Sequence, residues 1–179
     1  TTHYQKIKGD LNKDTGGSPV FIFTTTTNRE ITPLKSAFYI PDTRVLHFSM
    51  GNSGEDFYLY NEDEKKVGDK DRVANIMGVI PKNYEAIAYL NDNVYVFKGS
   101  LVYEVDFELK KIKIGYPKKI KTLFPQIPNN IDAAYINPND TDAYFFKDKL
   151  VYRFKLIKSN AGDALGKLVE RYPKNINQI

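Results

Sequence analysis

The chain has 179 residues, a formal net charge of +4 at pH 7, 13 Tyr and 11 Phe, and no Trp or Cys. The absence of cysteine excludes disulfides, thiolate nucleophiles and cysteine-ligated zinc. No apolar run has the ~20 residues of a membrane span, and the first ten residues lack the apolar core of a signal peptide. Length and composition indicate one globular domain, rich in strand-forming residues, that is stabilised by packing.

The first half of the chain contains two weak copies of a pattern that is clearer later. In residues 1–35, HYQKIKGDLN and PVFIF resemble the later NYEAIAYLND and AYFFK. In residues 36–83, Ser36-Ala37-Phe38 precedes Glu85-Ala86-Ile87 by 49 residues, and DFYLY takes the place of the later LVYEV. These matches predict two divergent repeats.

The second half contains two clear copies, in residues 84–130 and 131–179. IPKNYEAIAY and IPNNIDAAY open them, YVFKGSLVY and YFFKDKLVY follow, and GYPKKI and RYPKNI close them. Matched segments that recur in the same order, at a period of roughly 45–50 residues, indicate a stacked or radial repeat.

Each copy is predicted to be a small antiparallel sheet followed by a short helix. A strand with small residues comes first, and two strands with period-two alternation of apolar and aromatic residues follow it. The segment 110–115 predicts a short fourth strand. Proline suits the first turn of a helix, so we expect a helix from Pro117 that ends before Pro125.

Four such sheets arranged radially form an all-β, four-bladed β-propeller, whose closure protects the strand edges. We therefore predict a single domain with blades at approximately 1–35, 36–83, 84–130 and 131–179. The first strand of each blade lies nearest the axis, where crowding favours small side chains. The residues expected there are Ala37, Ala86, Ala133 and Ala134.

Four segments of the last copy resemble the hemopexin-like repeat family: Ile131-Asp132-Ala133-Ala134, Tyr144 to Asp148, Tyr152-Arg153-Phe154 and Tyr172-Pro173-Lys174. The family pattern is an Asp-Ala-Ala strand, an aromatic pair with Lys-Gly or Lys-Asp, an aromatic-Arg-aromatic strand, and Tyr-Pro-Lys before a helix. Residues 84–179 match it well, and the first two copies match it loosely. The family usually has Trp where Tyr103 and Tyr152 stand, and it often has a disulfide between the first and last blades.

The resemblance implies a central tunnel that holds an ion. In the family, main-chain carbonyls at the acid position of each inner strand line this tunnel, and the matching residues here are Gln5, Ser36, Glu85 and Asp132. Carbonyl oxygens suit calcium or sodium, and inward N–H groups deeper in the tunnel suit chloride. Lys6 stands where the family has a small residue, so an altered site or a water-filled tunnel is the alternative.

Two other binding sites were weighed against a plain structural role. Haem would need His3 or His47 as an axial ligand, but a single strand histidine is more often structural, so haem is not expected. A dense basic stretch is a candidate polyanion-binding site, with a solvated surface as the alternative. Its lysines are Lys110, Lys111, Lys113, Lys118, Lys119 and Lys121. The scarcity of arginine argues against nucleic acid as the partner.

The sequence contains no Ser-His-Asp arrangement in a recognisable context, no His-Glu-x-x-His motif and no phosphate-binding loop. It therefore predicts a protein without catalytic activity. The resemblance implies a secreted or extracellular binding module that recognises a protein partner. The alternative is a small-ligand binding protein that takes a polyamine or haem at the tunnel mouth.

Overall fold

The computed structural model describes residues 4–6, 23–25, 34–50, 56–90, 93–136, 142–157 and 164–178. Thr1–Thr32 and Pro33–Ile179 form separate units. In the first unit, β1 (Tyr4–Lys6) pairs antiparallel with β2 (Phe23–Thr25). Within its described residues, the second unit contains three antiparallel sheets of five strands each, which we call sheets I, II and III.

The three sheets follow one another along the chain. Sheet I consists of β3 (Leu34–Ile40), β4 (Val45–Met50), β5 (Asp56–Asn61), β6 (Lys66–Val67) and β7 (Asp71–Arg72), and helix α1 (Val73–Met77) follows it. Sheet II consists of β8 (Ala86–Leu90), β9 (Asn93–Lys98), β10 (Leu101–Asp106), β11 (Lys111–Ile112) and β12 (Lys118–Lys119), and helix α2 (Ile120–Leu123) follows it. Sheet III consists of β13 (Ala133–Ile136), β14 (Asp142–Lys147), β15 (Leu150–Leu156), β16 (Gly166–Leu168) and β17 (Lys174–Asn175), and a 3-10 turn, η1 (Ile176–Gln178), follows it.

All three sheets share one topology, which has more strands than the three or four predicted. The first three strands form a meander, and the two short strands then pair with the same outer edge of the third strand. In sheet II, β11 pairs with the end of β10 near Val105, and β12 pairs with its start near Val102. Two short strands cover the edge that a single exposed strand would leave open to other chains.

The predicted start of the second helix is wrong by three residues. Pro117 does not begin the helix, because Lys118 and Lys119 continue as strand β12 and α2 begins at Ile120. Ile120, Leu123 and Phe124 are nevertheless buried, so the expected apolar face of the helix does cap the sheet. Across the described residues no helix is long and apolar enough to cross a bilayer.

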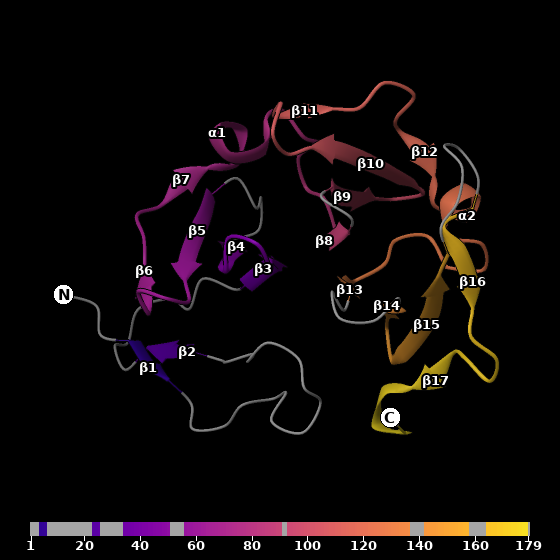
Figure 1. Cartoon of the computed structure of the whole chain (residues 1–179). Helices are drawn as coiled ribbons and strands as arrows, with labels where there is room; N and C mark the ends of the chain where they lie inside the picture. The colour runs from indigo at the N-terminus through magenta and orange to yellow at the C-terminus, as the bar shows by residue number, and fades with distance from the viewer. Residues whose placement is uncertain are drawn as a thin grey trace. The chain divides into compact units, whose positions relative to one another are not determined.

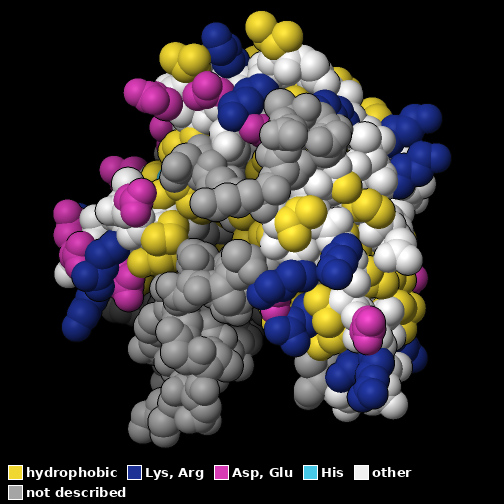
Figure 2. All heavy atoms as spheres, turned by 45° about the vertical axis from the view of Figure 1, so that its right-hand side comes forward, with side chains coloured by type: hydrophobic (Ala, Val, Ile, Leu, Met, Phe, Trp, Pro, Cys, Tyr) yellow, Lys and Arg dark blue, Asp and Glu magenta, His cyan; other side chains and the backbone are white. Residues whose placement is uncertain are grey.

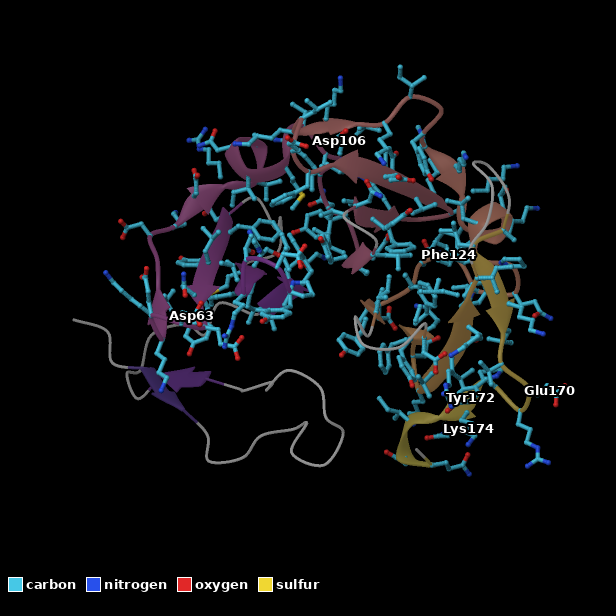
Figure 3. All side chains as sticks on the ribbon, in the orientation of Figure 1. Asp63, Asp106, Phe124, Glu170, Tyr172 and Lys174 are labelled. Atoms are coloured by element: carbon cyan, nitrogen blue, oxygen red, sulfur yellow. The ribbon has the colours of Figure 1, made fainter. Side chains whose placement is uncertain are left out.

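Two hydrophobic clusters hold the second unit together. One joins sheet I to sheet II and includes Phe38, Phe57 and the α1 residue Met77. The other joins sheet II to sheet III and is centred on Phe124 (Figure 3), whose ring lies 5.0 Å from that of Phe145. The three sheets therefore lie side by side, with sheet II in the middle (Figure 1).

Burial on both faces explains the nearly continuous apolar sequence of β9. Val94 and Val96 pack in the cluster shared with sheet I, whereas Tyr95 and Phe97 pack in the cluster shared with sheet III. Each of these four side chains is at most 5% exposed. Burying one large apolar side chain stabilises a fold by about 1.5–3 kcal/mol, so β9 is central to this unit.

Candidate functional site

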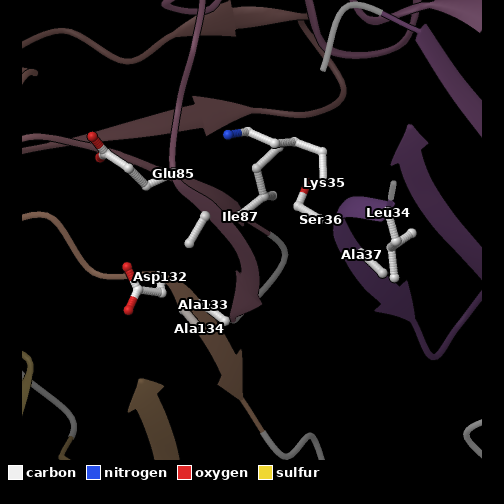
Figure 4. Close-up of a pocket in the computed structure, with 10 residues that line it drawn as sticks. Leu34, Lys35, Ser36, Ala37, Glu85, Ile87, Asp132, Ala133 and Ala134 are labelled. Atoms are coloured by element: carbon white, nitrogen blue, oxygen red, sulfur yellow. The ribbon is translucent and has the colours of Figure 1, made fainter. Parts of the chain in front are cut away.

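The first strands of the three sheets meet at a pocket. β8 lies between β3 and β13 and contacts both, and the pocket at their starts has a volume of about 330 Å³ (Figure 4). Its wall includes the four alanines expected near the axis, Ala37, Ala86, Ala133 and Ala134. Small side chains leave the space open there, and a larger residue would fill it.

Three of the four residues proposed as tunnel ligands line this pocket. Ser36, Glu85 and Asp132 come from three different sheets, and the fold brings all three together. Gln5 lies on β1 in the first unit, where it pairs with Thr24. Two other residues of this part of the chain were considered from the sequence. Lys6, which differs from the small residue of the family, is the last residue of β1, and the possible haem ligand His3 lies outside the described residues.

The two acidic side chains at the pocket are engaged by the hairpins of their own sheets. Glu85 Oε2 accepts a hydrogen bond of 2.6 Å from the Gly99 N–H. In the same way, Asp132 Oδ2 accepts a 2.6 Å hydrogen bond from the Asp148 N–H, and its Oδ1 lies 3.1 Å from the Lys147 ammonium. The Asp148 N–H and then Lys147 lower the pKa of Asp132. Each acid thus holds the segment just before the first strand of its sheet against the turn between the second and third strands.

Ser36 belongs to a buried polar cluster at the junction of sheets I and II. Its hydroxyl lies 3.0 Å from that of Ser49, and the Tyr84 hydroxyl donates a 2.8 Å hydrogen bond to Ser49. Tyr84 is 1% exposed, and burial raises the pKa of its hydroxyl. Hydrogen bonding within the cluster offsets the cost of burying these hydroxyls, and it fixes β3 beside the start of β8.

The strand register gives Lys35, rather than Ser36, the position that corresponds to Glu85. β3 ends at Ile40 and β8 ends at Leu90, so counting back the same number of residues aligns Ser36 with Ala86. The residue before each is Lys35 and Glu85. The register of β3 shifts between Leu34 and Ser36, which places Lys35 at an irregularity such as a β-bulge, where a side chain is re-aimed.

One side chain at this pocket carries a positive charge, which bears on the predicted tunnel cation. Calcium and sodium prefer a shell of oxygen ligands, whereas the Lys35 side chain brings an ammonium group to the pocket wall (Figure 4). No group of three or more His, Cys, Asp or Glu side chains suited to a metal occurs among the described residues. Chloride is compatible with an ammonium group and stays a proposal.

The six lysines of the basic stretch are spread along the outer edge of sheet II. Lys110 and Lys111 lie at one end of β10, and Lys118 and Lys119 lie at the other. The ammonium of Lys110 donates a 2.6 Å hydrogen bond to the Asn75 carbonyl. The other two members of the set are Lys113, which pairs with Glu104, and Lys121, which is exposed on α2. The structure therefore shows a basic rim and does not gather the six charges at one point.

A buried acid that the sequence analysis missed lies behind this rim. Glu104 is 9% exposed, its carboxylate lies 2.7 Å from the Lys113 ammonium, and it accepts hydrogen bonds from the Tyr95 and Tyr116 hydroxyls. Burial, together with the Glu104 charge, raises the pKa of both tyrosines. Period-two alternation in LVYEVD indicates a strand, but it does not show that both faces of the strand are covered, so the burial of Glu104 could not be read from the pattern.

The corresponding position of sheet III carries the opposite charge. Arg153 opposes Tyr144 across the strands as Glu104 opposes Tyr95. Its Nε donates a 2.6 Å hydrogen bond to Asp142, which is fully buried and also lies 3.1 Å from the Lys155 ammonium. In sheet II the charge of Glu104 is therefore balanced by Lys113, and in sheet III the charge of Arg153 is balanced by Asp142.

His47 lies on β4, as expected for a strand histidine, and is 4% exposed. Its ring stacks on Phe38 at 4.8 Å and meets the edge of Phe107 at 5.6 Å. Burial lowers its pKa to about 4. The ring is part of the apolar contact between sheets I and II, so it is not available to a haem without leaving that contact.

Residues 85–129 match the family model for hemopexin. Among characterised proteins, the chain is 31% identical over 94 residues to matrix metalloproteinase-21 of Mus musculus, which covers 49% of this chain and 15% of that protein. It is 29% identical over 134 residues to matrix metalloproteinase-21 of Xenopus laevis, which covers 68% of this chain and 22% of that protein. The chain thus matches only a minor part of these relatives.

Solved structures share the fold at low sequence identity. The hemopexin-fold protein CP4 from cow pea superposes with a TM-score of 0.64 at 16% identity, over 87% of this chain and 80% of that chain. The seed albumin LS24 from Lathyrus sativus superposes with a TM-score of 0.56 at 14% identity, over 84% of this chain and 95% of that chain.

Proposed function

Because the chain is a divergent member of the hemopexin-like repeat family, we propose that it is a non-catalytic binding module that recognises a protein partner outside the cell. The repeat family supports interaction rather than catalysis, and the similarity to matrix metalloproteinases is consistent with an extracellular location. Fold alone is a weak argument for function, so the proposal depends on the surface described next.

We further propose that residues 1–35 supply a fourth blade, and that the four blades close into a propeller. The antiparallel pairing of β1 with β2 supports a sheet in this segment. The weak sequence copy in HYQKIKGDLN supports the same conclusion.

The observation that carries the proposal is a set of exposed large apolar side chains at the rim of sheets I and II. Val79 is 82% exposed, Leu109 is 60% exposed and Ile114 is fully exposed. We call these three residues the rim patch. A single exposed apolar side chain is ordinary, whereas a group of them on one surface often marks a contact with another protein. The segments that carry Val79 and Leu109 pack against each other, as described next.

Two segments of the rim patch are held against each other. A Cβ on Gly78 would lie 1.8 Å from the Lys110 carbonyl oxygen, and Lys110 also bonds to the Asn75 carbonyl. The loop with Val79 therefore packs on the turn with Leu109. Lys110, Lys111 and Lys113 lie between Leu109 and Ile114 in the sequence, and Glu108 precedes Leu109. Figure 2 shows mainly lysine and arginine on the right of the view, and acidic side chains at its upper left. A partner with an acidic, partly apolar surface is complementary to such a rim.

The test uses the intact chain as bait in extracellular fluid, followed by cross-linking and mass spectrometry. We expect wild type to retain a specific protein and the double variant Leu109→Asp, Ile114→Asp to lose it. Ile157→Asp is the matched control. Ile157 is likewise an exposed apolar residue, with 55% exposure, but it follows β15 of sheet III and lies outside the rim patch. Equal retention by all three chains, or none by wild type, would overturn the proposal. Release by heparin alone would indicate the polyanion alternative.

The pocket of about 330 Å³ is the feature that favours the small-ligand alternative. The Lys35 ammonium at its wall disfavours a polyamine, because like charges repel, and His47 is buried away from solvent. Haem titration followed in the Soret region tests this alternative, and a stoichiometric rise in absorbance would support it.

A further inference from the structure

We propose that the pocket at the starts of β3, β8 and β13 carries its own cation, the Lys35 ammonium group, in the place where the fold would otherwise hold a metal ion. The inference concerns the state of the pocket and does not depend on the partner proposed for the rim patch. It predicts a module whose stability is independent of calcium.

The first argument is the position of Lys35 in the repeat. Glu85 and Asp132, at the corresponding positions of sheets II and III, direct their carboxylates to the N–H groups of their own hairpins. Lysine has no acceptor and cannot make this hydrogen bond. The register shift between Leu34 and Ser36 then allows the Lys35 side chain to leave the direction that the two acids take.

The second argument is the direction of the side chain. Figure 4 shows Lys35 extending from β3 across to the start of β8, with its nitrogen toward the side on which Glu85 and Asp132 lie. All three residues line the same pocket. The Glu85 carboxylate, which accepts its hydrogen bond from a neutral N–H group, makes this pocket favourable for positive charge, whereas the Asp132 carboxylate is already paired with Lys147.

The third argument is electrostatic. A tethered ammonium is present at any metal concentration, and a metal ion entering the same pocket would be repelled by it at short range. Among the described residues Lys35 forms no ion pair, with Glu85 and Asp132 included, so its charge acts on the pocket that it lines without a direct contact to either carboxylate.

The test compares thermal unfolding of the intact chain in excess EDTA and in millimolar calcium chloride. Three variants accompany wild type: Lys35→Met removes the charge at similar length, Lys35→Arg retains it, and Lys149→Met is the surface control on the exposed β14–β15 hairpin. We expect wild type, Lys35→Arg and Lys149→Met to unfold at the same temperature in EDTA and in calcium. We expect Lys35→Met to unfold roughly 3 °C below Lys149→Met in EDTA and to regain most of that loss in calcium.

Two results would overturn the proposal. One is calcium stabilisation of wild type, which would show that a metal binds despite Lys35. The other is a Lys35→Met variant as stable as Lys149→Met and equally indifferent to calcium, which would show that the ammonium is not the cation of the pocket. If Lys35→Met does not fold, calorimetric titration of wild type and Lys35→Arg with calcium decides, because heat of binding in either protein contradicts the proposal.

Discussion

The buried His47 makes the contact between sheets I and II sensitive to acid. Its ring lies between Phe38 and Phe107, and burial lowers its pKa to about 4 from an ordinary value of 6.5, against a smaller opposing effect from a backbone hydrogen bond with Val45. A folded-state pKa below the unfolded one means that folding favours the neutral ring. The stabilisation is therefore complete above pH 6.5 and is lost as the pH falls from 6.5 to 4.

The size of the effect follows from the two pKa values. The difference between 6.5 and about 4, at about 1.36 kcal/mol for each pH unit, is about 3.4 kcal/mol. Most of it falls within an accessible range, since linkage predicts a loss of about 2 kcal/mol between pH 7 and pH 5. This is a large share of the stability of an ordinary domain, which is about 5–15 kcal/mol.

Urea unfolding of wild type and His47→Phe at a series of pH values measures the effect. Phenylalanine keeps the ring contacts. It removes Nδ1, which has no hydrogen-bond partner, and it also removes the hydrogen bond with the Val45 backbone. All other titrating groups are common to both proteins, so the difference between their free energies of unfolding isolates His47. We expect wild type to lose about 2 kcal/mol relative to His47→Phe between pH 7 and pH 5. A difference that stays constant over this range would refute the reasoning.

Three further substitutions test the packing and the charges of the second unit. Phe124→Ala removes a ring with 0% exposure that contacts both sheets, so we expect a loss of about 3–5 kcal/mol in urea unfolding, and a loss under 1 kcal/mol would contradict the assigned contacts. Gly166→Ala would place a Cβ 2.1 Å from the Lys155 carbonyl oxygen; we expect a melting temperature lower by several degrees, and an unchanged value would show that β16 can move away at little cost. Asp142→Asn leaves the Arg153 guanidinium and the Lys155 ammonium without their shared carboxylate; we expect a loss of about 2 kcal/mol that high salt reduces, and a neutral result would mean that solvent compensates both cations.

The repeat pattern was sufficient to predict the sheets because it combines two independent periods. Alternation within YVFKGSLVY gives strands, and its recurrence in YFFKDKLVY gives equivalent strands in a second sheet. The structure confirms antiparallel pairing of both hairpins in the same register, with Phe97 opposite Val102 and Phe146 opposite Val151. The short outer strands were less predictable, because two residues are too few to show a period. Lys118 and Lys119 therefore looked like the start of a helix.

The alignment of sheet I with sheet II could not be predicted from the sequence, because insertions and deletions compensate one another there. The hairpin between Ile40 and Val45 is two residues longer than the one between Leu90 and Asn93. Part of this difference is hidden when a constant interval of 49 residues is assumed. That interval aligns Ser36 with Glu85, whereas the strand ends align Lys35 with it. The hydrogen-bonded pairing of the strands decides between these two alignments. The sequence does not, because neither Ser36 nor Lys35 has a strong preference for one face of a sheet.

Corresponding positions of the repeats have the same place in their sheets but can carry side chains of different charge. This holds for the position of Glu104 and Arg153 and for the position of Lys35. Glu104 and Arg153 occupy corresponding positions with opposite charges, and each is neutralised by a neighbour that its counterpart lacks, Lys113 in one sheet and Asp142 in the other. Such compensation preserves stability, because a buried charge without a partner is costly. Lys35 stands where sheets II and III have Glu85 and Asp132, and among the described residues it has no charged neighbour of this kind. No neighbouring carboxylate forms an ion pair with Lys35 among the described residues, so its charge is available to act on the pocket that it lines.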